Sequence, residues 1–365
     1  MKLPLPDIRL GQLEFVLLIL GFELGTSVIL SPAHQARQLS WLAIIAGLME
    51  ALLIVLCFTT LAKRFSGQTM IEICETVYGK IVGMVVAGLF IWYIFNLGSV
   101  VLRNSTDFLG TAIMPETPGS VIGAVMVLVA ACAVYYGIEV ISRCSVVLVP
   151  LTFLLFMITL GLQLSTFNFR NLFPLFDLPL DKFLLASHGA AMFPFGESVV
   201  FMMLFPFVNS QKYGKLTLLG LVSVSILFVL AAVRTITVLG ATAEIFTYPA
   251  FEAVKMLNLP YVNTRLEVVV AINFLTMSFL KLTVLYYGTV LSLSQFLRMR
   301  TPRPLVIPIG ILILTTSILD FRNISENLEF AEFTYPVYAL LFQFVIPGIT
   351  LLIAVLRGKK GEVTQ

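Results

Sequence analysis

The sequence predicts an all-α integral membrane protein with about ten membrane-spanning helices. Hydrophobic residues make up 59% of the 365 residues, and charged residues make up only 12%. Soluble domains carry roughly 25% charged residues, so this composition favours a lipid environment. Apolar runs long enough to cross a bilayer recur along the whole chain. These runs are continuous and do not alternate with polar residues, which argues against a β-barrel.

Short linkers that contain Gly, Pro and charged residues separate the apolar runs. None of these linkers is long enough for a soluble domain, so we expect residues 1–365 to form a single transmembrane domain. The predicted spans are 10–36, 41–62, 81–109, 119–138, 144–164, 186–208, 215–239, 266–296, 304–320 and 335–356.

Lysine and arginine residues are distributed unevenly between the two sides of these spans. If the N-terminus is cytoplasmic, fourteen of them lie in inner segments and six in outer loops. Cytoplasmic loops carry the excess of positive charge in membrane proteins, so we expect both termini to be cytoplasmic. The inner residues are Lys2, Arg9, Lys63, Arg64, Lys80, Arg143, Lys212, Lys215, Arg298, Arg300, Arg303, Arg357, Lys359 and Lys360, and the outer ones are Arg37, Arg170, Lys182, Lys255, Arg265 and Arg322.

The first span contains a segment that is unsuited to a continuous helix. Residues 21–32 read GFELGTSVILSP and place Gly25, Thr26 and Ser27 near the middle of the bilayer. An interrupted helix exposes backbone polar groups, which a membrane tolerates only where they face a protein cavity. The free N–H groups that open the second half-helix would favour an anionic group such as a carboxylate. We therefore predict that these three residues contact a ligand.

A second interruption is predicted in span 6, where residues 192–201 read MFPFGESVVF. The sequence GESV in this span matches GTSV in span 1, and the two spans run in opposite directions. Paired interruptions at equivalent places indicate an inverted repeat with the ligand between the breaks. We expect the two repeats at about 10–164 and 186–356; the alternative is that the small residues only allow close helix packing. The predicted contacts from span 6 are Phe193, Pro194, Phe195, Gly196 and Glu197.

Three further ionisable residues lie inside predicted spans, two of them within these breaks. They are Glu23 in span 1, Glu197 in span 6 and Lys281 in span 8. Such residues are costly in a bilayer, so each needs a partner or a role. We expect one carboxylate to pair with Lys281, either as a static ion pair or with the lysine acting as the cation where related transporters bind sodium. In span 3, Asn96 and Ser99 are candidates for ligand contact or for hydrogen bonds between helices.

Other polar residues in the spans carry less functional information. Arg103 and Asp107 are four residues apart and are expected to form a structural ion pair. Glu50 and Arg234 have no role that the sequence assigns. The two histidines are far apart and no Cys/His cluster has metal-ligand spacing, so we expect no metal and no cofactor. The sequence has no phosphate-binding loop, dinucleotide fingerprint or nucleophile motif, which argues against an enzyme.

The ten-span layout and three motifs resemble a known family. The motifs are GTSVILSP (25–32), GQTMIEICETVYGK (67–80) and FPFGES (193–198). Together they resemble the B subunits of spore germinant receptors, in the endospore germination permease family of the amino acid–polyamine–organocation superfamily. The resemblance covers essentially the whole chain. It implies a LeuT-like 5+5 inverted-repeat fold, with broken helices 1 and 6, in the inner membrane of a bacterial spore.

The resemblance also implies a function and partners. It implies that a small nutrient, typically an amino acid, binds between spans 1, 3, 6 and 8, and that a larger membrane A subunit and a lipoprotein C subunit are partners. Glu23 and Glu197 make the pocket more acidic than in many superfamily members, so the ligand could differ from a simple neutral amino acid. The alternatives are a proton-coupled amino acid permease, with Lys281 or Glu197 titrating, and a membrane scaffold that binds no ligand.

Overall fold

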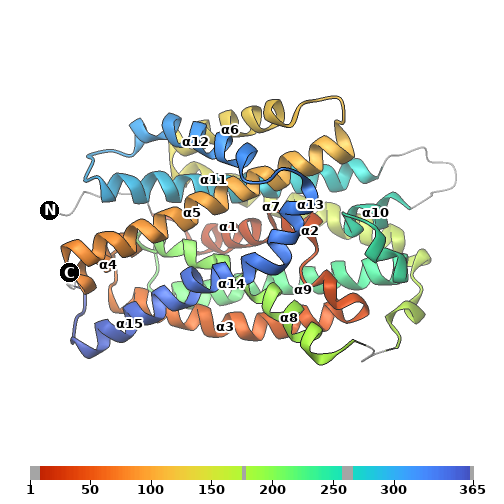
Figure 1. Cartoon of the computed structure of the whole chain (residues 1–365), viewed down its shortest axis with the longest axis horizontal. Coiled ribbons are helices and arrows are strands. Elements are labelled where there is room, and N and C mark those ends of the chain that lie inside the picture. The colour runs from red at the N-terminus through yellow and green to blue at the C-terminus, as the bar shows by residue number, and fades with distance from the viewer. Residues whose placement is uncertain (1–8, 175–177, 257–265, 362–365) are drawn as a thin grey trace.

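The computed structural model describes residues 9–174, 178–256 and 266–361 as an elongated bundle whose long helices run along its longest axis (Figure 1). Lys2 and Arg265, which enter the charge distribution above, lie outside the described residues. The elements of the first half are α1 (Gln12–Leu24), α2 (Ser27–Leu30), a 3-10 helix (His34–Leu39), α3 (Ser40–Arg64), α4 (Met70–Tyr78), α5 (Lys80–Phe108), a π-helix (Leu109–Ile113), α6 (Gly119–Tyr136), α7 (Ile138–Gln163) and 3-10 turns at Leu164–Thr166 and Phe169–Leu172.

The second half has more interruptions than the first. Its elements are α8 (Leu180–Met192), 3-10 helices at Phe195–Met203 and Phe205–Phe207, α9 (Tyr213–Leu239), a 3-10 helix (Gly240–Ile245), α10 (Pro249–Lys255), α11 (Glu267–Phe296), a 3-10 turn (Arg303–Leu305), α12 (Val306–Leu319), α13 (Ile324–Glu329), a π-helix (Phe330–Thr334), α14 (Tyr335–Leu340), a π-helix (Leu341–Val345) and α15 (Ile346–Leu356).

Ten membrane crossings follow from these elements. Among the described residues, seven helices are long and apolar enough to span a bilayer, and Arg303–Leu319 is a shorter apolar helix. The two remaining crossings are the interrupted ones. Helix 1 consists of α1 and α2, and helix 6 consists of α8 followed by the 3-10 helix Phe195–Met203. The predicted all-α fold with breaks in helices 1 and 6 is therefore confirmed.

Four predicted boundaries differ from the structure by six residues or more. The helices of spans 5 and 6 begin at Ile138 and Leu180, and not at 144 and 186. The other two lie in spans 1 and 10.

Span 1 was expected to continue to residue 36, but α2 ends at Leu30. Ser31 and Ala33 adopt positive φ angles of 45° and 57° around Pro32, and this left-handed backbone ends the helix. Span 10 was expected to begin at residue 335, but its helix begins at Ile324 and contains two π-helical stretches.

The two ends of the bundle carry different elements. At one end, α4 packs near the C-terminal part of the chain (Figure 1). There Arg64 Nε donates to Lys359 O at 2.7 Å, and Lys359 Nζ donates to Thr76 O at 2.7 Å. We call this the α4 end. The opposite end carries α10, and we call it the α10 end.

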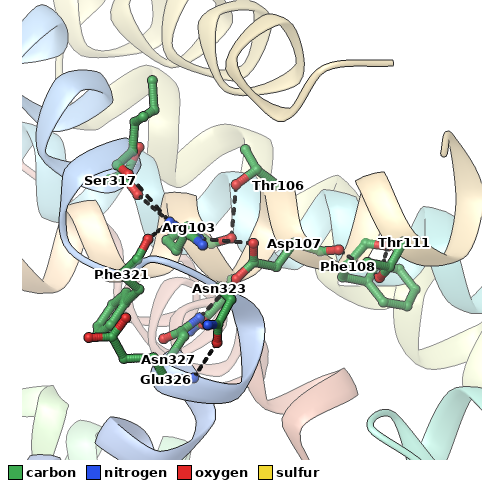
Figure 2. Close-up of polar contacts among 12 residues, drawn as sticks. Arg103, Thr106, Asp107, Phe108, Thr111, Ser317, Phe321, Asn323, Glu326 and Asn327 are labelled. Atoms are coloured by element: carbon green, nitrogen blue, oxygen red, sulfur yellow. Dashed lines mark hydrogen bonds and ion pairs between the residues drawn. The ribbon is translucent and has the colours of Figure 1, made fainter. Parts of the chain in front are cut away.

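A polar cluster joins α5 to the start of the last crossing (Figure 2). Arg103 Nε is 2.9 Å from Asp107 Oδ1, which confirms the predicted pair. Arg103 also donates to Phe321 O at 2.6 Å, and Asn327 donates to the other carboxylate oxygen of Asp107 at 3.1 Å. The cluster therefore satisfies carbonyl groups at the C-terminal end of α12 and just after it, and it fixes α13 against α5.

Replacing Arg103 with methionine is expected to lower the free energy of unfolding by about 2 kcal/mol, because Asp107 and the carbonyl of Phe321 lose a charged donor in a partly buried site. Arg143→Met is the matched control. Arg143 also pairs with a carboxylate four residues away, Glu139, but the two side chains are 68% and 43% exposed. Its loss should change stability by less than about 0.5 kcal/mol. Thermal unfolding in detergent measures both; equal losses would contradict the anchoring role.

Candidate functional site

The break in helix 1 brings glycine backbone against a lysine side chain. α1 ends at Leu24, and α2 starts at Ser27 after Gly25 and Thr26. A Cβ atom at Gly25 would overlap Cδ of Lys281 and would lie 2.8 Å from the carbonyl oxygen of Phe22. Glycine at this position therefore lets the lysine of α11 pass close to the interrupted backbone.

The break in helix 6 has the same character. α8 ends at Met192, and the chain resumes at Phe195 as a 3-10 helix. A Cβ atom at Gly196 would overlap the side-chain oxygen of Gln343 and would lie 3.0 Å from the carbonyl oxygen of Ala191. The glycine at each break thus makes room for a polar side chain from a helix far away in the sequence.

Three charged side chains meet between the breaks. Glu23, Glu197 and Lys281 are each fully buried, at 0% exposure. Lys281 Nζ forms an ion pair with Glu197 Oε2. Glu23 interacts electrostatically with both partners, but neither of its carboxyl oxygens has a hydrogen-bond partner within the described chain. The structure thus selects Glu197 as the ion-pair partner of Lys281 and leaves the second carboxyl group available.

Two aromatic rings enclose the lysine ammonium group. Nζ of Lys281 lies 5.1 Å from the ring centre of Phe22 and 5.0 Å from that of Phe193. Cations are attracted to the faces of aromatic rings at this range, and the attraction increases when water is excluded. Phe22 and Phe193 belong to helices 1 and 6, so both broken helices hold the same cation.

A hydrogen-bond network extends from Glu197 to other helices. Glu197 Oε1 accepts a hydrogen bond from Tyr335 at 2.6 Å, and the hydroxyl groups of Tyr335 and Tyr93 are 3.3 Å apart. Gln343 Nε2 donates to Tyr93 at 2.8 Å and to Met192 O at 2.9 Å. Sequence reasoning missed Tyr93, Tyr335 and Gln343. The available signal was the spacing of eight residues between Tyr335 and Gln343, which places both on one helix face.

A small cavity lies beside this network. Its volume is about 20 Å³, and Thr26, Phe193, Glu197, Tyr335 and Asn104 are among the residues that line it. Thr26 Oγ1 is buried and has no hydrogen-bond partner within the described residues. A cavity of this size holds roughly one water molecule. The conformation is therefore closed around the central site.

The α10 end has two larger cavities, of about 390 and 300 Å³. Leu30, Phe193 and Ala331 line both the smaller of these and the central cavity. Phe193 is therefore part of the wall that separates the site from the α10 end. Phe22 also packs edge to face on Phe201 with ring centres 5.2 Å apart, and both side chains are fully buried.

The predicted site residues do not all converge. Four of them lie beside the three charged side chains: Gly25, Thr26, Phe193 and Gly196. Asn96 instead lines a separate crevice of about 530 Å³ between α5 and the last crossing. The remaining predicted residues pack nearby without reaching the central cavity. Ser99 donates a hydrogen bond to the carbonyl oxygen of Phe95 at 3.3 Å, and the ring of Phe195 packs on that of Phe228. Pro194 directly precedes the 3-10 helix of helix 6. Ser27 lines the larger cavity at the α10 end.

The structure also shows the contacts of Glu50 and Arg234, the two residues to which the sequence assigned no role. Glu50 Oε1 lies 2.7 Å from His188 Nδ1 and links α3 to α8. Arg234 is 3% exposed and lies over the ring of Phe156. No group of three His, Cys, Asp or Glu side chains in the described ranges is arranged to hold a metal ion.

Comparisons with known sequences agree on one type of protein. A family model described as "Spore germination protein" matches residues 9–325. Spore germination protein KB of Bacillus subtilis (strain 168) is 27% identical over 97% of this chain and 96% of that protein. Spore germination protein B2 of the same organism is 21% identical over 97% of both chains.

Comparisons with solved structures support the fold. The nucleobase-cation-symport-1 family transporter Mhp1, closed with bromovinylhydantoin bound, superposes with a TM-score of 0.70 at 14% identity, over 96% of this chain and 81% of that one. MhsT in complex with L-phenylalanine superposes with a TM-score of 0.65 at 15% identity, over 96% of this chain and 99% of that one. The chain therefore has the LeuT-like fold of these transporters.

Replacing Lys281 with methionine is expected to lower the free energy of unfolding by about 3–5 kcal/mol, because Glu197 is left as a buried charge without a cation. Adding Glu197→Gln should restore part of this loss, since glutamine needs no counter-ion and can still accept the hydrogen bond of Tyr335. Thermal unfolding of both single variants and the double variant gives the coupling energy. Additivity within about 0.5 kcal/mol would show that the two side chains do not stabilise each other.

Proposed function

The chain belongs to the spore germination permease family, and from this premise we propose that it is the nutrient-sensing membrane subunit of a spore germinant receptor. The relatives and structural neighbours are germination proteins and transporters, which supports a small-molecule ligand and a non-catalytic role. The single observation that carries the proposal is the meeting of both helix breaks around Lys281, Glu197 and Glu23.

The charges at the site favour a ligand with an ammonium group. Two carboxyl groups face one lysine, and Glu23 has no hydrogen-bond partner among the described residues. A ligand ammonium would supply the missing positive charge. Its carboxylate would be bound by Thr26 Oγ1 and the N–H groups that begin α2. Because α2 has only four residues, its dipole contributes little, and the hydroxyl group is the more important donor.

Binding requires the site to open, because the central cavity has room for about one water molecule. We propose that Phe193 moves away and connects the central site to the cavities at the α10 end. A ligand shifts the balance between closed and open states only by binding one of them more tightly. The resulting helix movement would pass directly to an A-type membrane subunit and a C-type lipoprotein subunit in the same receptor.

The proposed membrane orientation places the α4 end in the cytoplasm. Four basic side chains form hydrogen bonds at this end: Arg64, Arg298, Arg357 and Lys359. An excess of positive residues favours the cytoplasmic side of a membrane. Both termini would then be cytoplasmic in the inner membrane of the spore. The proposed repeats are those expected from the sequence, about 10–164 and 186–356.

A proton-coupled amino acid permease is the second candidate. Glu23 next to the Lys281–Glu197 pair favours it, since a carboxyl group beside a buried ion pair can exchange a proton during transport. Uptake of amino acids into proteoliposomes under a pH gradient tests this candidate. Uptake that depends on the pH gradient would support transport, and binding without uptake would support sensing alone.

Gly25→Ala is expected to abolish nutrient binding, because the added Cβ displaces the side chain of Lys281 and occupies space beside the interrupted backbone of helix 1. Gly88→Ala is the matched control, since a Cβ at Gly88 meets nothing within 4 Å. The twenty amino acids are screened for thermal stabilisation of the wild type and both variants in detergent. Stabilisation of the wild type and Gly88→Ala, but not of Gly25→Ala, is expected.

Equal stabilisation of all three proteins would show that the ligand binds elsewhere. If no amino acid stabilises the wild type, while Gly25→Ala prevents assembly with the partner subunits, the scaffold alternative is favoured.

A further inference from the structure

Arg234 in α9 is a buried cation without an acidic partner among the described residues. Its side chain is 3% exposed, and Nε has no hydrogen-bond acceptor in that part of the chain. The guanidinium lies 5.1 Å from the ring centre of Phe156. A ring face offsets only part of the cost of removing a charge from water, so the arrangement lacks a counter-ion.

Arg234 lines a cavity of about 50 Å³ between helix 1, α7, α9 and α11. The polar residues Ser27, Asn273, Thr152 and Thr159 line the same cavity, and none of its described lining residues is acidic. Ser27 Oγ is buried and has no hydrogen-bond partner among the described residues. The cavity has room for a few water molecules or one small ion, but not for a whole amino acid.

An entry route for an anion lies next to this cavity. Ser27, Val28, Phe228 and Ala231 line both it and the 390 Å³ cavity at the α10 end. Arg37, Glu244 and Arg170 also line the larger cavity. Arg37 pairs with Glu244 at 3.0 Å, whereas Arg170 forms no ion pair within the described ranges, so the lining carries one excess positive charge. Positive side chains around a cleft raise the local concentration of anions.

We propose that Arg234, Ser27 and Asn273 form a binding site for a small monovalent anion, either a halide or a carboxylate. The guanidinium supplies the charge, and the hydroxyl and amide groups supply further donors. This site is distinct from the central one, because Thr26 lines the central cavity and Ser27 lines the cavity of Arg234. The bound anion contacts the start of α2 and stabilises the interrupted form of helix 1.

The test measures the unfolding temperature of the full-length protein in detergent without phospholipid or nutrient. Sodium gluconate is replaced by chloride, bromide or acetate at constant ionic strength. Gluconate is too large for the cavity, so we expect a higher unfolding temperature in one of the smaller anions. A rise in chloride and bromide alone identifies a free halide, and a rise in acetate alone identifies a carboxylate.

Arg234→Met should lose this dependence on the anion, whereas the control Arg143→Met, at an exposed position, should keep it. Should Arg234→Met fail to fold, Asn273→Ala replaces it and should raise the concentration of anion that gives half of the effect. The proposal is overturned if the wild type unfolds at one temperature in all four salts, or if the variant responds as the wild type does. Because no nutrient is present, this failure is separate from a failure of the central site.

Discussion

The ion pair between Lys281 and Glu197 is the interaction on which the rest of the site depends. It is fully buried, and it connects α11 to the broken helix 6. Removing two charges from water costs several kcal/mol per ion, so such a pair persists only when its surroundings supply further contacts. The rings of Phe22 and Phe193 and the hydroxyl of Tyr335 supply them here. The Lys281–Glu197 pair therefore joins the interrupted helices 1 and 6 to the last membrane crossing.

The glycine residues at the breaks follow from the same constraint. Gly25 packs against Lys281, and Gly196 packs against Gln343, which belongs to the network that reaches Glu197 through Tyr93 and Tyr335. A side chain at either glycine would displace a buried polar group from its present ion-pair or hydrogen-bond partners. Close approach of backbone and polar side chain, and not flexibility alone, therefore explains the need for glycine at both positions.

The breaks and the buried charges could be predicted from the sequence because both are local signals. Glycine or proline combined with polar residues in the middle of an apolar run predicts an interruption, whereas α7 continues through the isolated Pro150. A charge within a span requires a partner. The pairing of Lys281 with Glu197 rather than Glu23 could not be predicted, since it depends on how the helices pack. For the same reason the sequence could not separate the roles of Tyr93 and Asn96, which both lie on α5. Tyr93 joins the hydrogen-bond network, whereas Asn96 lines another crevice.

The small central cavity has a kinetic consequence. Under the proposed function, a nutrient cannot enter a space that holds about one water molecule, so its association would wait for a conformation in which Phe193 has moved. The association rate would then be the encounter rate multiplied by the fraction of molecules that are open, and it would fall well below the rate for a preformed pocket. The same closed wall slows dissociation once a ligand is held. A receptor subunit that works in this way would respond to sustained exposure to its nutrient and not to brief encounters.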